Sequence, residues 1–266
     1  MKLFAVIMAG GVGSRFWPKS REAMPKQFQD VFGGRSLYQR TFDRVARFIL
    51  PENIFIVTNR AQQTLASEQL PEIPKRNIIV EPFGRSTAPC IASAASAISS
   101  VTDNAVMVVL PSDHLISQED NFISQLKDAV RLADIHHALV TIGIAPTHPE
   151  TGFGYIHYEM GDSAQELTTP VQRTGFPTSG VGYKVIAFKE KPDHDTAVGF
   201  LQSGNYLWNS GMFVWRVDVI LEELKKNLKH FSDFHSSLKN EFGKTDFDKV
   251  IEEFYSKVDS ISIDYA

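Results

Sequence analysis

Short apolar runs alternate with longer amphipathic stretches along most of the chain. Short runs rich in Val and Ile predict buried strands, and apolar residues spaced by three and four predict helices. Their alternation is typical of a doubly wound, mostly parallel, Rossmann-like α/β sheet with helices on both faces. The expected strands are 4–8, 54–58, 78–80, 105–110, 138–144 and 183–188, and the expected helical stretches are 37–50, 60–69, 88–100, 120–134, 195–203 and 217–257.

Three of the expected strands run directly into polar or glycine-rich segments. These segments are residues 9–15, 81–89 and 111–114. In a doubly wound sheet, ligands bind outside the carboxyl ends of the parallel strands. We therefore expect the three segments to lie together and to form a site.

The segment after the first strand reads Ala-Gly-Gly-Val-Gly-Ser-Arg. Glycines let the backbone turn sharply and approach a ligand closely, because they carry no Cβ. A strand followed by such a turn can offer several backbone N–H groups to one anion. We predict a phosphate-binding loop supported by nearby cations, and the residues concerned are Gly10, Gly11, Gly13, Arg15, Lys19, Arg21 and Lys26.

Other glycine-rich motifs fit this segment less well. A P-loop would need a Lys-Ser/Thr pair after its last glycine, and none follows at that spacing. A dinucleotide-binding fingerprint would need a third glycine at the position of Phe16. A turn used only for packing would need neither Arg nor Lys at fixed offsets.

The strand 105–110 ends in Pro-Ser-Asp-His, residues 111–114. A carboxylate at the tip of a buried strand, beside a predicted phosphate-binding loop, is well placed to bind Mg²⁺. This ion prefers one or two carboxylates together with phosphate oxygens and water. An isolated Asp after a strand is more often a helix cap, so the assignment of Asp113 depends on its neighbours.

The composition is that of an ordinary globular protein of 266 residues, with 43% hydrophobic and 22% charged residues. This length suits one large α/β domain over residues 1–266, or one domain with a small appendage. A net charge of −4 argues against a general nucleic-acid binder. The single cysteine fits a reducing compartment, and we find neither a signal peptide nor an apolar run long enough to span a membrane. We expect a cytoplasmic protein.

Several motifs resemble the sugar-phosphate nucleotidyltransferase family, and in detail its mannose-1-phosphate guanylyltransferase branch. The first is Gly-Gly-x-Gly-x-Arg followed by Pro-Lys-Gln-Phe. The second is Glu-Pro-x-x-Arg-Ser-Thr-Ala-Pro, in which Ser86 replaces the Asn of the family. The others are Pro-Ser-Asp-His, Pro-Thr-x-Pro-Glu-Thr-Gly-Phe-Gly-Tyr-Ile, Glu-Lys-Pro, Leu-Trp-Asn-Ser-Gly-Met-Phe-Val-Trp and the final Ile-Asp-Tyr-Ala.

The resemblance implies roles for the residues around the nucleotide. The glycine loop with Arg15 would hold the β- and γ-phosphates of GTP, and Lys26 would contact the α-phosphate. Glu81 and Pro82 would lie against the base. Guanine carries two donors, N1–H and the 2-amino group, so a carboxylate is a sensible partner. The alternative is that Glu81 only caps the helix that follows it.

The resemblance also implies a sugar site and a metal site. Gly154, Glu190 and Asn209 would contact the sugar, and Lys191 would hold its phosphate. Arg15, Lys26 and Lys191 are therefore the expected catalytic residues. Asp113 and Asp264 would bind Mg²⁺, with Asp264 on a strand.

The implied reaction is the transfer of GMP from GTP to mannose 1-phosphate, giving GDP-mannose and pyrophosphate. Two alternatives stay open. A related enzyme could use another base or sugar, or the chain could be a non-catalytic, nucleotide-sugar-binding regulatory subunit. The family continues beyond Ile-Asp-Tyr-Ala with a C-terminal β segment that this sequence lacks. We therefore expect Asp264 to be poorly held and a family-type homodimer to be weakened.

Overall fold

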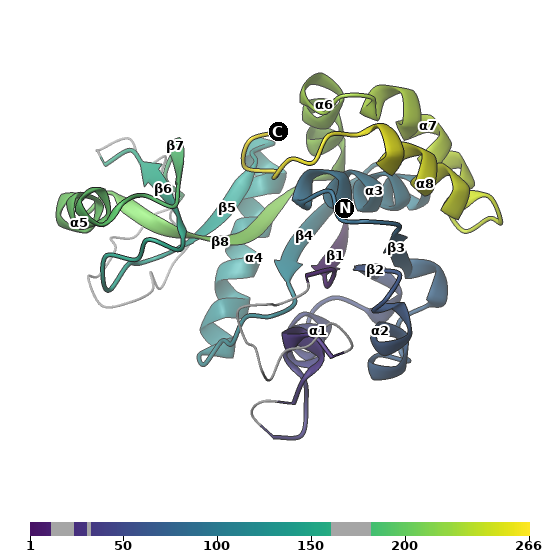
Figure 1. Cartoon of the computed structure of the whole chain (residues 1–266), viewed down its shortest axis with the longest axis horizontal. Helices are drawn as coiled ribbons and strands as arrows, with labels where there is room; N and C mark the ends of the chain where they lie inside the picture. Colours follow the sequence, from purple (N-terminus) through teal and green to yellow (C-terminus); the bar gives the residue numbers. More distant parts are fainter. Residues whose placement is uncertain (12–23, 31–32, 161–181) are drawn as a thin grey trace.

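The computed structural model describes residues 1–11, 24–30, 33–160 and 182–266. Its strands form one eight-stranded sheet (Figure 1). The strands are β1 (Lys2–Met8), β2 (Ile54–Asn59), β3 (Ile78–Glu81), β4 (Ala105–Pro111), β5 (Val140–Ile144), β6 (Gly154–Tyr158), β7 (Val185–Glu190) and β8 (Tyr206–Arg216). Every strand expected from the apolar runs is present, with ends shifted by a few residues. The strands β6 and β8 were not predicted as strands.

The helices also follow the predicted pattern, except that the stretch 217–257 forms three helices instead of one continuous segment. The α-helices are α1 (Leu37–Ala46), α2 (Gln63–Gln69), α3 (Thr87–Val101), α4 (Glu119–His136), α5 (His194–Ser203), α6 (Val217–Asn227), α7 (Phe231–Glu241) and α8 (Phe247–Lys257). Short 3₁₀ turns are η2 (Lys26–Phe28), η3 (Pro51–Asn53) and η4 (Lys75–Asn77). Helix α1 begins with the capping box that its sequence suggests, in which Ser36 and Gln39 bond reciprocally.

The sheet order is β3-β2-β1-β4-β8-β6-β7, and β5 pairs with β8. Strands β3, β2, β1 and β4 are parallel. Strand β8 is antiparallel to β4, and both β5 and β6 are antiparallel to β8. It follows that β5 and β6 run in the same direction as β4. The doubly wound, mostly parallel α/β fold is confirmed, with two strands, β7 and β8, running the other way.

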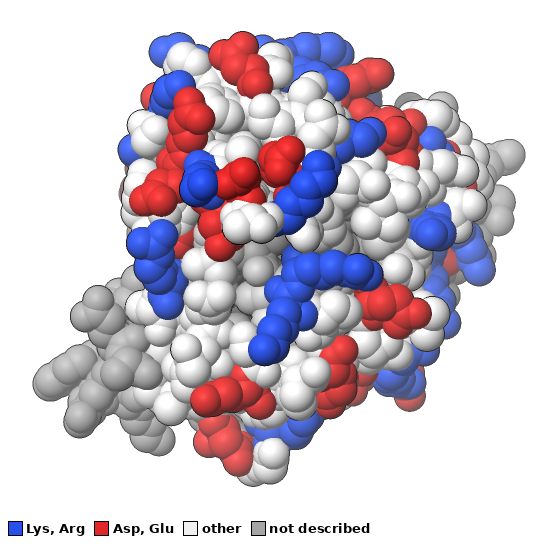
Figure 2. All heavy atoms as spheres, turned by 90° about the vertical axis from the view of Figure 1, so that its right-hand side faces the viewer, with Lys and Arg blue, Asp and Glu red and all other residues white. Residues whose placement is uncertain are grey.

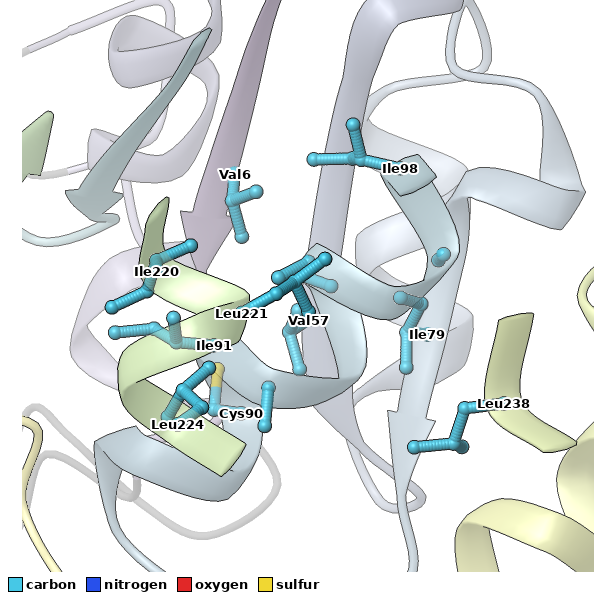
Figure 3. Close-up of a cluster of buried hydrophobic side chains, with 14 of the residues drawn as sticks. Val6, Val57, Ile79, Cys90, Ile91, Ile98, Ile220, Leu221, Leu224 and Leu238 are labelled. Atoms are coloured by element: carbon cyan, nitrogen blue, oxygen red, sulfur yellow. The ribbon is translucent and has the colours of Figure 1, made fainter. Parts of the chain in front are cut away.

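Alternation along the central strands gives the sheet two buried faces. Phe4 and Val6 of β1 belong to one core with α3, α6, α7 and α8. Ala5 and Ile7 belong to the other core with α1, α2 and α4. Figure 3 shows part of the first core, in which the small side chains of α3 let this helix pack closely between the sheet and α6.

Strand β8 pairs with β4 and with β6 along the same edge, and a short stretch between the two pairings, here called the opening, pairs with neither strand. Val214 pairs with both β4 and β5, and Trp208 pairs with both β5 and β6. Since a strand has only two edges, β4 and β6 must lie on the same edge of β8. Residues 209–212 of β8 therefore lie between the carboxyl end of β4 and the start of β6.

The last residues, 259–266, correct two expectations. They form turns, not a strand, and they are bonded to the start of α3. The N–H of Ala88 donates to the Ile261 carbonyl, and the N–H of Ile263 donates to Thr87 Oγ1. These bonds hold Asp264 in place, so the expectation that it would be poorly held is wrong.

Two observations concern the surface. Figure 2 shows acidic and basic side chains interspersed over the face that carries α2, β3 and α8. Within the described residues, no helix combines the length and the apolar character needed to cross a membrane.

Candidate active site

The glycine loop follows β1, and the carbonyl groups of its described residues accept hydrogen bonds from side chains at or just after the end of β2 and in η2. The Ala9 carbonyl accepts from Thr58 Oγ1 at 3.1 Å and the Gly10 carbonyl from Asn59 Nδ2 at 2.9 Å. The Gly11 carbonyl accepts from Gln27 Nε2 at 2.7 Å and from Gln62 Nε2 at 3.2 Å. Three successive carbonyls are thus held by side chains.

These bonds fix the direction of the neighbouring N–H groups. In a planar trans peptide, the C=O and the following N–H point in opposite directions. With the carbonyls of Ala9 and Gly10 held toward β2, the N–H groups of Gly10 and Gly11 point away from the protein side. Successive N–H groups that face outward from a strand end form an anion-binding arrangement. This arrangement of the described residues can bind an anion such as a phosphate group.

A side chain at position 10 would come too close to the side chain of Glu81. A Cβ added to Gly10 would lie 2.7 Å from Glu81 Oε2. We expect Gly10→Ala to lower the free energy of unfolding by about 1–3 kcal/mol and to weaken GTP binding about tenfold or more. Urea unfolding and calorimetric titration would measure the two effects.

The matched control is Gly199→Ala in α5, where an added Cβ meets nothing within 4 Å. This change should leave GTP binding unaltered and should not destabilise the protein, because Ala is favoured over Gly in a helix. Equal effects of the two substitutions would contradict the close approach at Gly10.

Lys26, the first residue of η2, and Asp113, which follows the end of β4, meet beside the loop. Lys26 Nζ lies 3.5 Å from Asp113 Oδ2, and their side chains are 24% and 44% exposed. Below them, the buried Arg44 donates from NH2 to the His114 carbonyl at 3.2 Å. Burial lowers the pKa of His114 below its usual value, which favours the neutral ring. An ammonium and a carboxylate are therefore presented at the strand end.

Glu81 is a buried carboxyl group at the carboxyl end of β3. Its residue is 7% exposed, and its Oε1 accepts a hydrogen bond from the Tyr255 hydroxyl at 2.9 Å. Burial raises the pKa of Glu81 to about 7, and the bond from Tyr255 opposes that rise. Helix α3 has no side-chain hydrogen bond at its N-cap, Ser86, which does not support the capping alternative.

A second polar group lies where β6, β7 and β8 meet. Gly154 pairs with Glu190, and a Cβ on Gly154 would lie 2.8 Å from Glu190 Oε2 and 3.5 Å from Asn209 Cβ. Asn209 Nδ2 donates to Asp264 Oδ1 at 2.9 Å, and Ser262 Oγ donates to Asp264 Oδ2 at 2.7 Å. The structure therefore brings together Gly154, Glu190, Asn209 and Asp264, which are far apart in the sequence.

Two backbone features orient this group. Gly211 has a φ of 66°, in the left-handed region that favours glycine, and its N–H donates to Asn209 Oδ1 at 3.0 Å. An added Cβ on Gly211 would lie 3.6 Å from Pro111, at the end of β4. Lys191 lies at the end of β7, with Nζ 3.2 Å from Glu190 Oε1. The bend at Gly211 thus brings the polar group of Gly154, Glu190, Asn209 and Asp264 next to the end of β4, the strand that Asp113 follows.

Comparison with known proteins identifies the family. The sequence profile described as "Nucleotidyl transferase" matches residues 4–249. The chain belongs to the nucleotidyl transferase family. The family predicted from the motifs is confirmed.

Two curated relatives are similar to this chain over nearly its whole length. The mannose-1-phosphate guanylyltransferase of Klebsiella pneumoniae is 39% identical over 99% of this chain and 54% of its own length. The mannose-1-phosphate guanylyltransferase RfbM of Salmonella typhimurium is 41% identical over 100% of this chain and 53% of its own. The chain spans about half the length of these curated relatives.

The crystal structure of a Thermus thermophilus protein, described as a mannose-1-phosphate geranyltransferase, superposes with a TM-score of 0.78. It is 29% identical and covers 100% of this chain and 70% of its own. The sheet and the helical layers of the described residues therefore follow the fold of this family.

Four residues of the predicted phosphate-binding segment lie outside the described residues, namely Gly13, Arg15, Lys19 and Arg21. Pro82 is described and directly follows Glu81 on the way out of β3. Ser86, which stands where the family has Asn, has a φ of 65°.

Sequence reasoning missed several residues that support the site. Thr58, Asn59 and Gln62 hold the carbonyls of the loop. Asn59 stands at the carboxyl end of a parallel strand, and the position that marked residues of the other strands as candidates could have marked it too. Gln27 was considered only as part of the Pro-Lys-Gln-Phe motif. No local signal marks Tyr255, which lies in a helix distant in sequence from Glu81.

The residues fit a hard divalent cation. The Asp113 carboxylate is half-exposed at the strand end, and Asp264 offers two carboxylate oxygens beside Asn209. Mg²⁺ takes one or two protein carboxylates and completes its shell with phosphate oxygens and water. The described residues contain no group of three or more His, Cys, Asp or Glu side chains that could hold a metal by themselves. Such a site would therefore take its remaining ligands from the substrate.

Proposed function

We propose that the chain transfers GMP from GTP to mannose 1-phosphate, giving GDP-mannose and pyrophosphate. The observation that supports this most directly is the juxtaposition of the glycine loop with the Lys26–Asp113 pair. The names of the relatives support the choice of base and sugar.

In this proposal, an oxygen of mannose 1-phosphate attacks the α-phosphorus of GTP in line. The new bond joins that oxygen to the α-phosphorus, and the bond to the β-phosphate oxygen breaks, so pyrophosphate leaves. The attacking group is already an anion, so neither a protein nucleophile nor a strong general base is required. Catalysis then depends on positioning and on neutralising charge.

The nucleotide side of the proposed site uses the loop and β3. Gly10, Gly11, Gly13 and Arg15 hold the β- and γ-phosphates, and Lys26 contacts the α-phosphate. Lys26 lies next to Asp113 with its side chain partly exposed, a position from which it can turn toward a phosphate. Glu81 and Pro82 lie against the base, with Glu81 accepting from guanine when ionised.

The sugar side uses the β6–β7–β8 group. Gly154, Glu190 and Asn209 contact the mannose hydroxyls, for which an amide and a carboxylate supply both donors and acceptors. Lys191 binds the sugar phosphate and aligns its oxygen for attack. Asp113 and Asp264 would bind Mg²⁺, which when bound neutralises phosphate charge.

We further propose the cytoplasm as the location, because the one cysteine, Cys90, is a buried free thiol. A homodimer, as the resemblance implies, stays a prediction.

The decisive experiment is pyrophosphate release with mannose 1-phosphate and Mg²⁺, with GTP, ATP, dTTP and UTP tested side by side. We expect release with GTP to exceed that with the other nucleotides by at least about tenfold, since a lost or misplaced polar contact to the base leaves buried groups unpaired. Removal of Mg²⁺ with a chelator should abolish release.

The outcomes separate the alternatives. Preference for another nucleotide, or for glucose 1-phosphate, would indicate a related transferase with a different base or sugar. Binding of GTP without release from any nucleotide would indicate a regulatory binding subunit. Either result would overturn the proposed reaction.

A further inference from the structure

Tyr255 contacts three residues of the segment that leaves β3, each through a different part of the residue. Its hydroxyl donates to Glu81 Oε1 at 2.9 Å. Its ring meets the Phe83 ring edge-on, with centroids 6.2 Å apart. Its backbone carbonyl accepts from Arg85 Nε at 3.2 Å. Tyr255, whose side chain is fully buried on α8, therefore contacts the segment 81–85 at three points.

The segment 81–85 presents groups suited to a purine. Phe83 is 41% exposed, and the Arg85 guanidinium lies 5.1 Å from the centre of its ring. The second oxygen of Glu81 faces the glycine loop, close to Gly10. An aromatic face, a planar cation and a carboxylate acceptor are groups that stack on a base or bond to its edge.

We propose that Tyr255 is a positioning residue for nucleotide binding, which orients the Glu81 carboxylate and holds the 81–85 segment against the glycine loop. The proposal rests on the proposed function, in which Glu81 contacts the base of GTP. It goes beyond that function by assigning this role to a residue of the helical layer.

The charge state of Glu81 gives this role a measurable signature. Burial raises the pKa of Glu81 to about 7, and the hydrogen bond from Tyr255 counteracts the rise. Among the described residues, the titratable groups that face Glu81 are Tyr255 from α8 and Cys90 from α3, and burial raises the pKa of both well above their ordinary values. Both are therefore neutral near pH 7.

GTP binding should depend on the charge of Glu81. Only the ionised carboxylate accepts both guanine donors, so GTP binding should strengthen as the pH rises through about 7. Removal of the Tyr255 hydroxyl takes away a bond that favours the ionised form, so the pKa of Glu81 should rise further. Binding near neutral pH should then weaken and should recover at higher pH.

The test is Tyr255→Phe, with GTP affinity measured by calorimetry between about pH 6 and about pH 9. At about pH 7 we expect affinity for GTP to fall about tenfold, as for the loss of a hydrogen bond to a charged group. At about pH 9 the affinity should return to within about threefold of the wild type. In steady-state turnover at about pH 7, the KM for GTP should rise, and kcat should change by less than about threefold.

Tyr38→Phe is the matched control. Tyr38 is also fully buried and its hydroxyl also makes one bond, to the Ala66 carbonyl, but it lies in the other core. It should leave the pH profile of GTP binding unchanged. Glu81→Gln should remove the pH dependence near 7 in both the wild-type and the Tyr255→Phe backgrounds.

The results decide whether Tyr255 has this role. A loss of affinity that is the same at every pH, or no loss at all, would overturn the positioning role of Tyr255. If the wild type binds GTP but releases no pyrophosphate, the proposed reaction fails and the binding profile still tests Tyr255. If the wild type does not bind GTP, both proposals are wrong.

Discussion

Replacement of Lys26 by Ala is expected to lower kcat/KM for GTP by about 10²–10³-fold, the usual cost of losing one group that neutralises charge in the transition state. Negative charge develops on the oxygen that bridges the α- and β-phosphates as pyrophosphate leaves. In the proposed mechanism, Lys26, which lies 3.5 Å from Asp113 at the strand end, would neutralise that charge. Steady-state pyrophosphate release measures the loss.

The fold should survive this substitution. A partly exposed ion pair contributes about 0–1 kcal/mol, so the unfolding temperature should change little. Lys239→Ala is the matched control, because Lys239 also pairs with a carboxylate, Asp103, but on α7 and outside the site. If Lys26→Ala released pyrophosphate as fast as Lys239→Ala, the assignment of Lys26 would be wrong.

Asp113→Asn is expected to produce the second large effect. The substitution keeps the shape of the side chain and removes the negative charge that attracts a hard cation. We expect turnover to fall by about 10²–10³-fold at low Mg²⁺, with partial recovery as Mg²⁺ is raised. A titration of pyrophosphate release against Mg²⁺ measures both the affinity for the metal and the limiting rate.

Asp264→Asn should act in the same direction, from the other side of the opening along β8. The amide introduced by this substitution would face two hydrogen-bond donors, Asn209 Nδ2 and Ser262 Oγ, and its own NH₂ group cannot accept from them. Circular dichroism should therefore accompany the kinetics, to show that the fold is unchanged. Asp103→Asn breaks the control ion pair with Lys239 and should leave the Mg²⁺ titration unchanged. An unaltered Mg²⁺ requirement in Asp113→Asn would falsify its role as a metal ligand.

The sequence predicted the central part of the fold well because its signals are local. The apolar runs of β1, β2 and β4 are buried on both faces, so each is continuous and easy to recognise. The residues at the strand ends follow directly in the chain, and for that reason Gly10, Glu81 and Asp113 could be assigned to one edge of the sheet.

The sequence was less informative about β6 and β8. Strand β8 contains Asn209, Ser210 and Gly211, which weaken a strand signal, and they belong to the part of β8 that lies between β4 and β6. Two of these residues belong to the candidate site, because Asn209 bonds to Asp264 and the N–H of Gly211 bonds to Asn209. Their role became visible only once the pairing of β8 with three other strands was known.

The supporting contacts of the site depend on meetings between distant segments. Gln62 and Asn59 turn the carbonyls of the glycine loop inward, and Tyr255 reaches Glu81 across 174 positions of sequence. No periodicity or motif encodes such a contact, because it depends on how helices and strands pack. The final turn that holds Asp264 is a further example, since its bonds go to the start of α3.

By itself, the sequence determined the α/β class, the family and the residues that stand at the strand ends, because these depend on short-range pattern and on motifs. Only the tertiary structure decided that Gly154, Glu190, Asn209 and Asp264 form one group, that the loop N–H groups face outward, and that Glu81 is buried against Tyr255. The physical reason is that burial, and with it the pKa of about 7 at Glu81, results from packing between elements far apart in the chain.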